Sequence, residues 1–517
     1  MGCCLSKPNA YTVGDYEPSS ADYTDAPDGS GLKLCTKDSR TFIRRDTRRT
    51  ERPRVREGQM WTDPDFPLQV AITDNASKHL LWMRPQEFVS DPVLFSNGTF
   101  RLDIQQRNFG TCWFLAMLST LADKPDLCKQ VINERSYTPR TDGICHCRLW
   151  SFGEWEDVYI DDHLPVFPDG RTLYGAASAT ARNEMWVPLM EKALARFHGS
   201  YTVVEGGYTS DAYLMLTGGI AEKIDFYNRR SRAASYNIFS RISNALHSDA
   251  LVTCAVSARY HGRMGLMGPH AYSVSGSYVV TRRDGVKVPL LRIRNPHGKR
   301  EWTGRWCDGS GEWDTLEEGS HIHRNSNEGE FWIDVGDFLR YFKNVTICSL
   351  TPDFDKDGRS DSLNYVLRVF SEWRGKSAVG PGSWLRQKLS NPRITFTVPK
   401  TGEDFTPVVV QLIQRAGFMD YAAIRCDMFK VVRGDEKSGT IYVDDLPGAN
   451  PFRLYESSLQ WSSRYKLSPG RYIVIPSTYH SGVEREFLIR VYTPCPLYNC
   501  GTIPGEVTVK QEGMCMC

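Results

Sequence analysis

The chain has 517 residues, a length that favours two to four domains over a single core. Hydrophobic residues make up 41% of it and aromatic residues 12%, which is enough to build packed cores and excludes a wholly disordered protein. The formal charge of +2 excludes an overall attraction to nucleic acid, and no stretch of about 18 apolar residues predicts a membrane-spanning helix.

The N-terminal residues MGCCLS contain no apolar signal segment and fit the pattern for N-myristoylation, with Gly2 exposed once Met1 is removed. A myristoyl chain alone binds membranes reversibly, so stable attachment needs a second signal. Palmitoylation of Cys3 and Cys4 would supply it. We therefore expect a cytoplasmic protein at the inner face of the plasma membrane or another cytosol-facing membrane, with its 15 cysteines reduced. A chance match to this short pattern is the alternative.

Residues 1–65 are polar and show no sustained apolar period, as expected of a flexible arm. Seven arginines lie between Arg44 and Arg56. Such a run is usually a solvated or salt-bridged face, and on an acylated arm it would also suit contact with anionic lipid headgroups. At the other end of the chain, Cys515 and Cys517 leave open whether the tail is modified.

An unbroken apolar run begins at Cys112 and predicts a helix that is buried nearly all round. Cys112 would lie at the N-terminal end of that helix, where unpaired backbone N–H groups favour the reactive thiolate. Gly110 would allow the backbone to approach a substrate closely. A lone cysteine in apolar surroundings is more often an inert core residue, so a chemical role depends on partners elsewhere in the chain.

The partners of a nucleophilic cysteine are a base and a group that orients the base. His270 and Asn295 supply these residue types, and each lies beside a strand pattern downstream of Cys112. The order Cys, His, Asn is that of papain-like peptidases. Gln106 supplies a side-chain amide that is suited, with the backbone N–H of Cys112, to an oxyanion hole.

Further motifs accompany these residues in a fixed order. The pattern Q-x-x-x-G-x-C-W at 106–113 is followed by FGEW, DDHLP, EMWVPLMEKALA, GGYTSDAYLMLTGG, HAYSV, RIRNP, EWTGRW and GEFW. In these motifs the chain resembles the calpain family of cysteine peptidases over about 80–350 and, more weakly, to about 493. The resemblance implies an α+β fold, with a papain-like core of two subdomains followed by an antiparallel, C2-like β-sandwich.

The expected domain boundaries combine this resemblance with changes of pattern along the chain. The glycine-punctuated stretch 194–219 marks a joint between the two halves of the core. Beyond about 360, short alternating runs such as RITFTV and TPVVVQLI are typical of a β-sandwich. The expected units are an arm at 1–65, a catalytic domain at 66–350 with subdomains at 66–204 and 205–350, an acidic linker at 351–364, a sandwich at 365–500 and a tail at 501–517.

The resemblance also implies calcium in each subdomain, drawing the two halves together. Carboxylates and carbonyls are the ligands that Ca²⁺ needs. By motif position, the first site would use Asp103 and Glu184 with backbone oxygens near Ser96 and Gly98. The second site would use four acidic residues and one backbone carbonyl, namely Glu301, Asp308, Glu328, Glu330 and the carbonyl near Ser326.

The chain departs from the family pattern at four positions. Thr111 replaces the usual Asp, Pro269 replaces the usual Gly before the histidine, and Glu328 stands where Asp is usual. His297 replaces the Trp that usually follows Asn-Pro, so the aromatic cover over the histidine–asparagine hydrogen bond is smaller and more polar. These substitutions bear on rate and calcium requirement more than on the reaction class.

Two other segments carry metal-binding residue types. The stretch DFDKDGRSDSLN at 353–364 matches a calcium-loop pattern but ends in Asn364 instead of Glu and lacks paired helices. We interpret it as an acidic linker, with weak calcium binding as the alternative. Cys145, His146 and Cys147 have no second pair at zinc spacing, so alternating side chains of a strand are the preferred interpretation.

The first hypothesis is a membrane-tethered, calcium-dependent cysteine endopeptidase that makes limited cuts in protein substrates. The second is a catalytically weak or inactive calpain-like scaffold at a membrane or the cytoskeleton. In a third, the sandwich acts mainly as a calcium-regulated phospholipid module. No nucleic-acid partner is expected, and no dimer through an EF-hand domain, because the chain has no room for that domain after residue 500.

Overall fold

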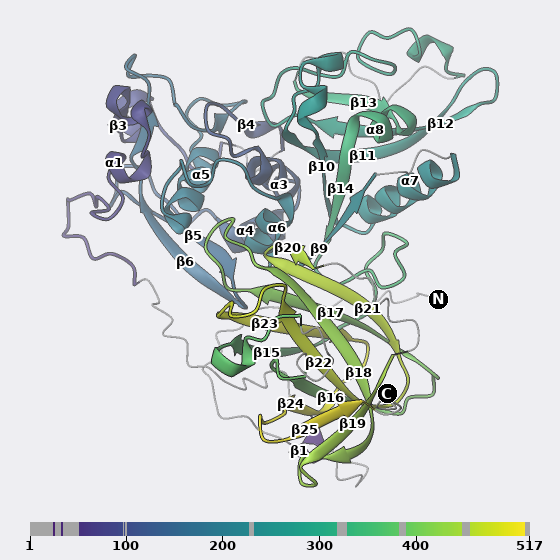
Figure 1. Cartoon of the computed structure of the whole chain (residues 1–517). Helices are drawn as coiled ribbons and strands as arrows, with labels where there is room; N and C mark the ends of the chain where they lie inside the picture. Colours follow the sequence, from purple (N-terminus) through teal and green to yellow (C-terminus); the bar gives the residue numbers. More distant parts are fainter. Residues whose placement is uncertain are drawn as a thin grey trace, which may run out of the picture.

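The computed structural model describes residues 51–96, 98, 101–226, 232–317, 328–381, 389–446 and 455–511, together with two short strands at 24–25 and 33–34. Figure 1 shows three regions: a helix-rich region in purple to blue, a region built on one sheet in teal, and a β-rich region in green to yellow. Among the described helices, none combines the length and apolar character needed to cross a membrane.

The first region is built around α3 (Cys112–Ala122), in which every side chain from Trp113 to Ala122 is buried. This confirms the helix predicted from the apolar run. The other helices of the region are α1 (Leu68–Ala71), α2 (Pro85–Phe88), α4 (Pro125–Val131), α5 (Trp186–His198) and α6 (Thr209–Thr217). Its strands form antiparallel pairs, β3 (Leu81–Met83) with β7 (Leu164–Val166), β4 (Ile104–Gln105) with β8 (Ala177–Ser178), and β5 (Ile144–Ser151) with β6 (Glu154–Asp161).

The second region is an antiparallel sheet with the strand order β13-β12-β11-β10-β14-β9. Its strands are β9 (Ile220–Asp225), β10 (Leu251–Val256), β11 (His270–Thr281), β12 (Lys287–Arg294), β13 (Glu330–Asp334) and β14 (Phe342–Ser349). Helices α7 (Arg232–His247) and α8 (Val335–Tyr341) pack on one face of the sheet. Helix α3 of the first region lies against β10 and β11. The strand expected beside Asn295 is β12.

The two regions meet at Gly218 and Gly219, between α6 and β9. Side chains of α6 such as Tyr213 and Leu216 pack in the first core, whereas Ile224 of β9 packs in the second. The expected boundary between 204 and 205 is therefore too early, because the sequence pattern does not show which core α6 joins. Gly218 has a left-handed φ of 67°, and a Cβ there would lie 2.7 Å from the ring of Trp150.

The third region is the predicted antiparallel sandwich. One sheet has the order β15-β23-β17-β21, with β15 (Tyr365–Trp373), β23 (Arg485–Thr493), β17 (Thr406–Gln414) and β21 (Gln460–Leu467). The other sheet has the order β1-β2-β24-β16-β22-β18-β19-β25. Its strands are β1 (Thr24–Asp25), β2 (Lys33–Leu34), β24 (Tyr498–Thr502), β16 (Ile394–Val398), β22 (Gly470–Thr478), β18 (Ala423–Asp435), β19 (Thr440–Asp445) and β25 (Thr508–Gln511). A further short strand, β20 (Glu456–Ser457), pairs with β18.

The sandwich extends beyond the expected end at residue 500. Strand β25 pairs in parallel with β19, so residues of the expected tail complete the sheet. That long-range pairing leaves no local signal in the sequence.

Cys500 is disulfide-bonded, so the expectation that all cysteines are reduced does not hold at this position.

The sandwich packs against the first region and the joint. Trp150, Phe152 and Leu214 share an apolar cluster with Ile413 and Leu488 of the sandwich. In addition, Arg490 of β23 donates to the carbonyls of the two joint glycines at 2.5 and 2.9 Å. These contacts fix the sandwich next to the element that connects the two halves of the core.

Candidate active site

Cys112 lies at the first residue of α3, with its thiol half-buried. The backbone N–H groups of Ala271, Trp113 and Cys112 itself point at the sulfur. Burial raises the pKa of the thiol above its usual value, and it outweighs these N–H groups, which act to lower it. The N–H groups at the start of the helix therefore favour the thiolate as expected, but burial has the larger effect in this arrangement.

His270 and Asn295 are brought together by the pairing of β11 with β12, since His270 begins β11 and Asn295 directly follows β12. His270 Nε2 lies 2.9 Å from Asn295 Oδ1. Both side chains are buried. Burial lowers the pKa of His270 to about 4, although the hydrogen bond to Asn295 opposes the shift. The imidazole is therefore neutral near pH 7 and able to accept a proton.

The two halves of the site meet at the start of β11. Because the N–H of Ala271 points at the sulfur of Cys112, the residue next to His270 touches the nucleophile across the interface between the regions. The structure thus brings the neutral thiol of Cys112 against the strand that begins with His270, whose neutral imidazole is held by Asn295. This is the chemistry of a cysteine nucleophile with an oriented base.

Gln106 is buried beside these residues, with its Nε2 donating to the carbonyl of Phe109 at 2.8 Å. An amide nitrogen carries two hydrogens, so one remains for a second acceptor. The backbone N–H of Gln106 donates to the carbonyl of Pro296 at 2.7 Å. This bond joins Gln106 to the segment that carries Asn295. The oxyanion-hole role expected of the amide stays a prediction.

Comparison with known proteins agrees with this geometry. The family model "Calpain family cysteine protease" matches residues 61–349, and "Calpain large subunit, domain III" matches residues 369–492. The chain belongs to the calpain family. The two matched segments are the two-part core and the β-sandwich.

Several calpains are similar to the chain over most of its length. Calpain-A of Drosophila melanogaster is 32% identical over 477 residues, which cover 84% of this chain and 56% of the relative. Calpain-12 of Homo sapiens is 32% identical over 489 residues, covering 84% and 67%. The Calpain-1 catalytic subunit of Pongo abelii is 32% identical over 475 residues, covering 85% and 65%. The chain therefore spans between about half and two thirds of the length of these calpains.

His297 replaces the expected aromatic cover in this calpain. Its ring is stacked on that of His270, with the ring centroids 5.0 Å apart and an interplanar angle of 26°. Its backbone N–H donates to Asn295 Oδ1 at 3.1 Å. Burial lowers the pKa of His297, so this imidazole is also neutral near pH 7. Pro269, the other departure beside the histidine, follows a cis peptide bond to Gly268.

Thr111 has a partner that sequence reasoning missed. Its hydroxyl donates to Oε1 of Glu191 at 2.5 Å, and the N–H of Ala176 donates to Oε2 at 2.7 Å. Glu191 belongs to α5 and is 1% exposed. Burial raises the pKa of this carboxyl to about 7. The sequence signal that could have indicated this role is a charged residue, Glu191, among the mainly apolar residues of the motif EMWVPLMEKALA.

The first expected calcium site has its acidic residues close together. Asp103 and Glu184 are both buried. Burial raises the pKa of Glu184 most, and the negative charge of Asp103 raises it further. Glu184 accepts the N–H of Ser96 at 2.8 Å and the hydroxyl of Ser178 at 2.7 Å. Gly98 follows Ser96 with a φ of 82°. Two buried carboxylates that repel one another suit a hard divalent cation.

The second expected calcium site also gathers acidic residues. Burial raises the pKa of Glu301 to about 7, and the charges of Asp308 and Glu328 add to the shift. A set of mutually repelling carboxylates fits Ca²⁺, whose charge would relieve that repulsion. The expected ligand Ser326 lies outside the described residues.

Glu330 differs from the other acidic residues because an arginine from the first region holds it. Arg101 Nε lies 2.8 Å from Oε1, and Arg101 Nη2 lies 3.4 Å from Oε2. Although burial opposes it, the contacts with Arg101 and Arg292 keep the pKa of Glu330 below its usual value. The carboxylate that the second site would use is thus ion-paired across the two halves of the core.

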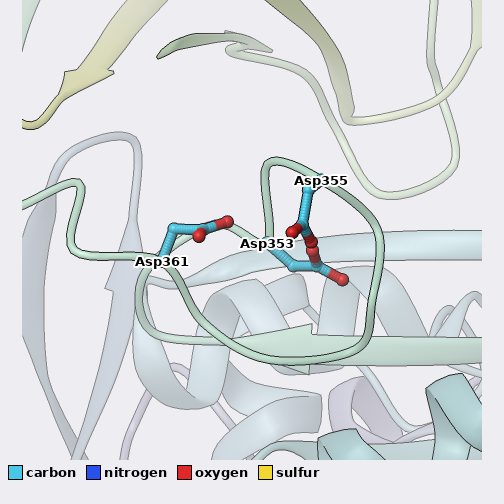
Figure 2. Close-up of side chains that lie close together, drawn as sticks. All are labelled: Asp353, Asp355 and Asp361. Carbon is cyan, nitrogen blue, oxygen red and sulfur yellow. The ribbon is translucent and has the colours of Figure 1, made fainter.

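Figure 2 shows a third acidic cluster, in which the carboxylates of Asp353, Asp355 and Asp361 lie near one another in the loop between β14 and β15. The backbone of the loop already donates to them: the N–H groups of Lys356 and Gly358 contact Asp353 at 2.6 and 2.8 Å. No described helix pair flanks this loop. Its interpretation as an acidic linker stays a prediction.

Cys145 and Cys147 are buried on β5 while His146 between them is half-exposed, which confirms the interpretation as alternating side chains of a strand. The lipidation residues Gly2, Cys3 and Cys4 lie outside the described residues.

Proposed function

We propose that this calpain is a calcium-dependent cysteine endopeptidase that makes limited cuts in protein substrates. Two observations support this most directly: the N–H of Ala271, the residue after His270, points at the sulfur of Cys112, and His270 is hydrogen-bonded to Asn295. The proposed catalytic unit spans 66–350, and the sandwich that follows is a separate module packed against it.

In the proposed reaction, the thiol proton of Cys112 passes to Nδ1 of His270 as the sulfur attacks the scissile carbonyl carbon. The second Nε2 hydrogen of Gln106 and the N–H of Cys112 stabilise the oxyanion. The intermediate collapses to a thioester, and His270 gives its proton to the departing amine. Water then attacks the thioester with His270 as the base, which releases the acid and restores the thiol. Asn295 keeps the imidazole oriented throughout.

Calcium dependence is part of the proposal and rests on the donor sets. Bound calcium would supply positive charge to the carboxylates of Asp103 and Glu184 in one half and of Glu301, Asp308 and Glu328 in the other.

In the arrangement described, burial disfavours both the thiolate of Cys112 and the imidazolium of His270, so both residues are held in their less reactive, neutral forms. We therefore propose that the arrangement with Arg101 bound to Glu330 is the low-activity state.

Attachment to a cytosol-facing membrane, by myristate on Gly2 and palmitate on Cys3 and Cys4, is also proposed. The sequence pattern supports it. In cells, the protein should pellet with membranes, Cys3→Ser with Cys4→Ser should bind only weakly, and Gly2→Ala should be soluble. A membrane-bound Gly2→Ala variant would contradict acylation as the anchor.

A catalytically weak scaffold is the second candidate. Two observations favour it: the neutral thiol–imidazole pair, and the small polar ring of His297 where the family usually has Trp. The scaffold would act through the same membrane attachment but would not require turnover.

Labelling with a thiol-directed peptidyl epoxide, with and without calcium, separates the two candidates, with Cys112→Ala as the control. Calcium-dependent labelling confined to Cys112 supports the endopeptidase. Labelling of equal rate without calcium removes the calcium requirement. No labelling of a folded protein in either condition, as judged by circular dichroism, moves the scaffold ahead.

A further inference from the structure

The loop at 415–422, between β17 and β18 of the sandwich, carries Phe418 into the first region. The ring of Phe418 lies 5.3 Å from that of Trp113 and 4.7 Å from that of His198, measured between centroids. Phe418 packs as a partly buried member of the first core. An aromatic side chain of the sandwich thus touches the residue that directly follows Cys112.

Trp113 is enclosed on its other sides by the segment at 204–207. Its Nε1 donates to the carbonyl of Val204 at 3.0 Å, and a Cβ added to Gly207 would lie 2.6 Å from the indole. The same segment is tied to the chain two residues before the nucleophile, because the N–H of Gly206 donates to the carbonyl of Gly110 at 2.9 Å. With 1% of its surface exposed, Trp113 has little freedom to tilt.

The loop that presents Phe418 is itself fastened at several points. Tyr421 donates its hydroxyl to Oδ2 of Asp211 at 2.8 Å, and Asp211 is buried in the first turn of α6. Arg485 of β23 donates to the carbonyl of Asp420 at 2.5 Å, and Gln414 donates to the carbonyl of Ala422 at 2.8 Å. The ring is therefore held in place by both the sandwich and the first region.

We propose that Phe418 is a positioning residue for Cys112, acting through Trp113, so that the sandwich forms part of the support of the nucleophile. The expected effect on catalysis rests on the proposed function. Removing the ring leaves space on one side of the indole, and Trp113 can then tilt away from the 204–207 segment. Because Trp113 and Cys112 share the first turn of α3, the sulfur moves relative to the N–H groups that point at it.

The test compares Phe418→Ala with two controls in the full-length protein. Met419→Ala removes a neighbouring side chain of the same loop that is 46% exposed, and Phe418→Tyr keeps the ring. The readouts are the rate of alkylation of Cys112 by iodoacetamide against pH, followed by mass spectrometry, and kcat and KM on a peptide substrate with calcium present. Alkylation reports on the thiol without any requirement for proteolysis.

For Phe418→Ala we expect an alkylation profile shifted to higher pH and kcat reduced about tenfold, with KM changed less than about threefold. Both controls should match the wild type. An unchanged profile and an unchanged kcat in Phe418→Ala overturn the proposal. If Phe418→Ala does not fold, Tyr421→Phe, which removes one fastening of the loop, should shift the profile in the same direction, and no shift overturns it.

The two proposals fail in distinguishable ways. A wild type that alkylates but cleaves nothing contradicts the endopeptidase, while a shifted profile in Phe418→Ala still supports the positioning role. A wild type that cleaves normally alongside a Phe418→Ala variant with unchanged profile and kcat contradicts only the positioning role.

Discussion

The side-chain carbonyl of Asn295 faces His270 because the amide nitrogen on its other side is already engaged. Nδ2 donates to the carbonyls of Lys299 and Arg300 at 2.7 and 3.0 Å, which leaves Oδ1 at 2.9 Å from His270 Nε2. A neutral imidazole that donates through Nε2 must accept through Nδ1. The turn after β12 therefore selects the tautomer in which His270 can take the thiol proton.

Asn295→Ala should lower kcat by about 10²-fold, because the imidazole loses the partner that fixes its orientation and tautomer. It should also destabilise the fold by about 1 kcal/mol, since the carbonyls of Lys299 and Arg300 lose their shared donor. Peptide hydrolysis and thermal unfolding measure the two effects separately. Asn295→Asp keeps the acceptor but loses the donors, so it should lose similar stability and retain more activity. Near-normal kcat in Asn295→Ala would contradict the orienting role.

Arg101→Met should increase calcium affinity. The guanidinium of Arg101 forms a largely buried ion pair with Glu330 through two contacts. A calcium ion that binds Glu330 must therefore compete with Arg101. We expect the half-saturating calcium concentration to fall about tenfold, equivalent to roughly 1.4 kcal/mol. Calorimetric titration in a Cys112→Ala background avoids self-cleavage. Arg52→Met, which breaks an ion pair whose arginine is 60% exposed, is the matched control. Unchanged or weaker binding in Arg101→Met would contradict this competition.

The local spacing of apolar residues was enough to predict the main helices and strands. The buried helix α3 and the strands β12, β16 and β17 were expected from apolar runs or alternation, because these patterns can be seen over a few neighbouring positions. The catalytic candidates were found from motifs, which preserve residue type and order. None of these inferences needed knowledge of contacts between distant segments.

Long-range contacts explain what the sequence did not reveal. The packing of Phe418 on Trp113 joins segments that lie far apart in the chain, and the pairing of β25 with β19 is similarly remote. The start of a helix, which favours the thiolate of Cys112, is visible in the sequence, whereas the burial that outweighs this effect is a property of the packed site.

The ring of His297 is stacked on that of His270. We predict that it shields the hydrogen bond between His270 and Asn295 from water, so its size should matter more than its charge near pH 7. His297→Ala should lower kcat about fivefold, because water gains access to that bond. His297→Trp, which restores the residue usual in the family, should keep or raise kcat. Steady-state kinetics with calcium at saturation measures both. Equal activity of His297→Ala and the wild type would show that the stacked ring has no shielding role.

Glu191→Gln should remove part of the pH dependence of stability. The folded state holds the proton of Glu191 up to about pH 7, whereas the unfolded chain releases it near the ordinary value of 4.5. Stability is therefore lost as pH rises from about 4.5 to about 7, by as much as about 3 kcal/mol from this group, and the loss is complete above pH 7.

Glutamine can replace the carboxyl without leaving a polar atom unpaired. Its oxygen can accept the N–H of Ala176, and its NH₂ can donate to the hydroxyl of Thr111, which rotates to accept. Thermal midpoints between pH 4.5 and 8 should show that the advantage of Glu191→Gln over the wild type grows through this window and then levels off. Glu57→Gln, at an exposed position, should show no such trend. A constant difference between Glu191→Gln and the wild type across the window would mean that Glu191 is already ionised in the folded state.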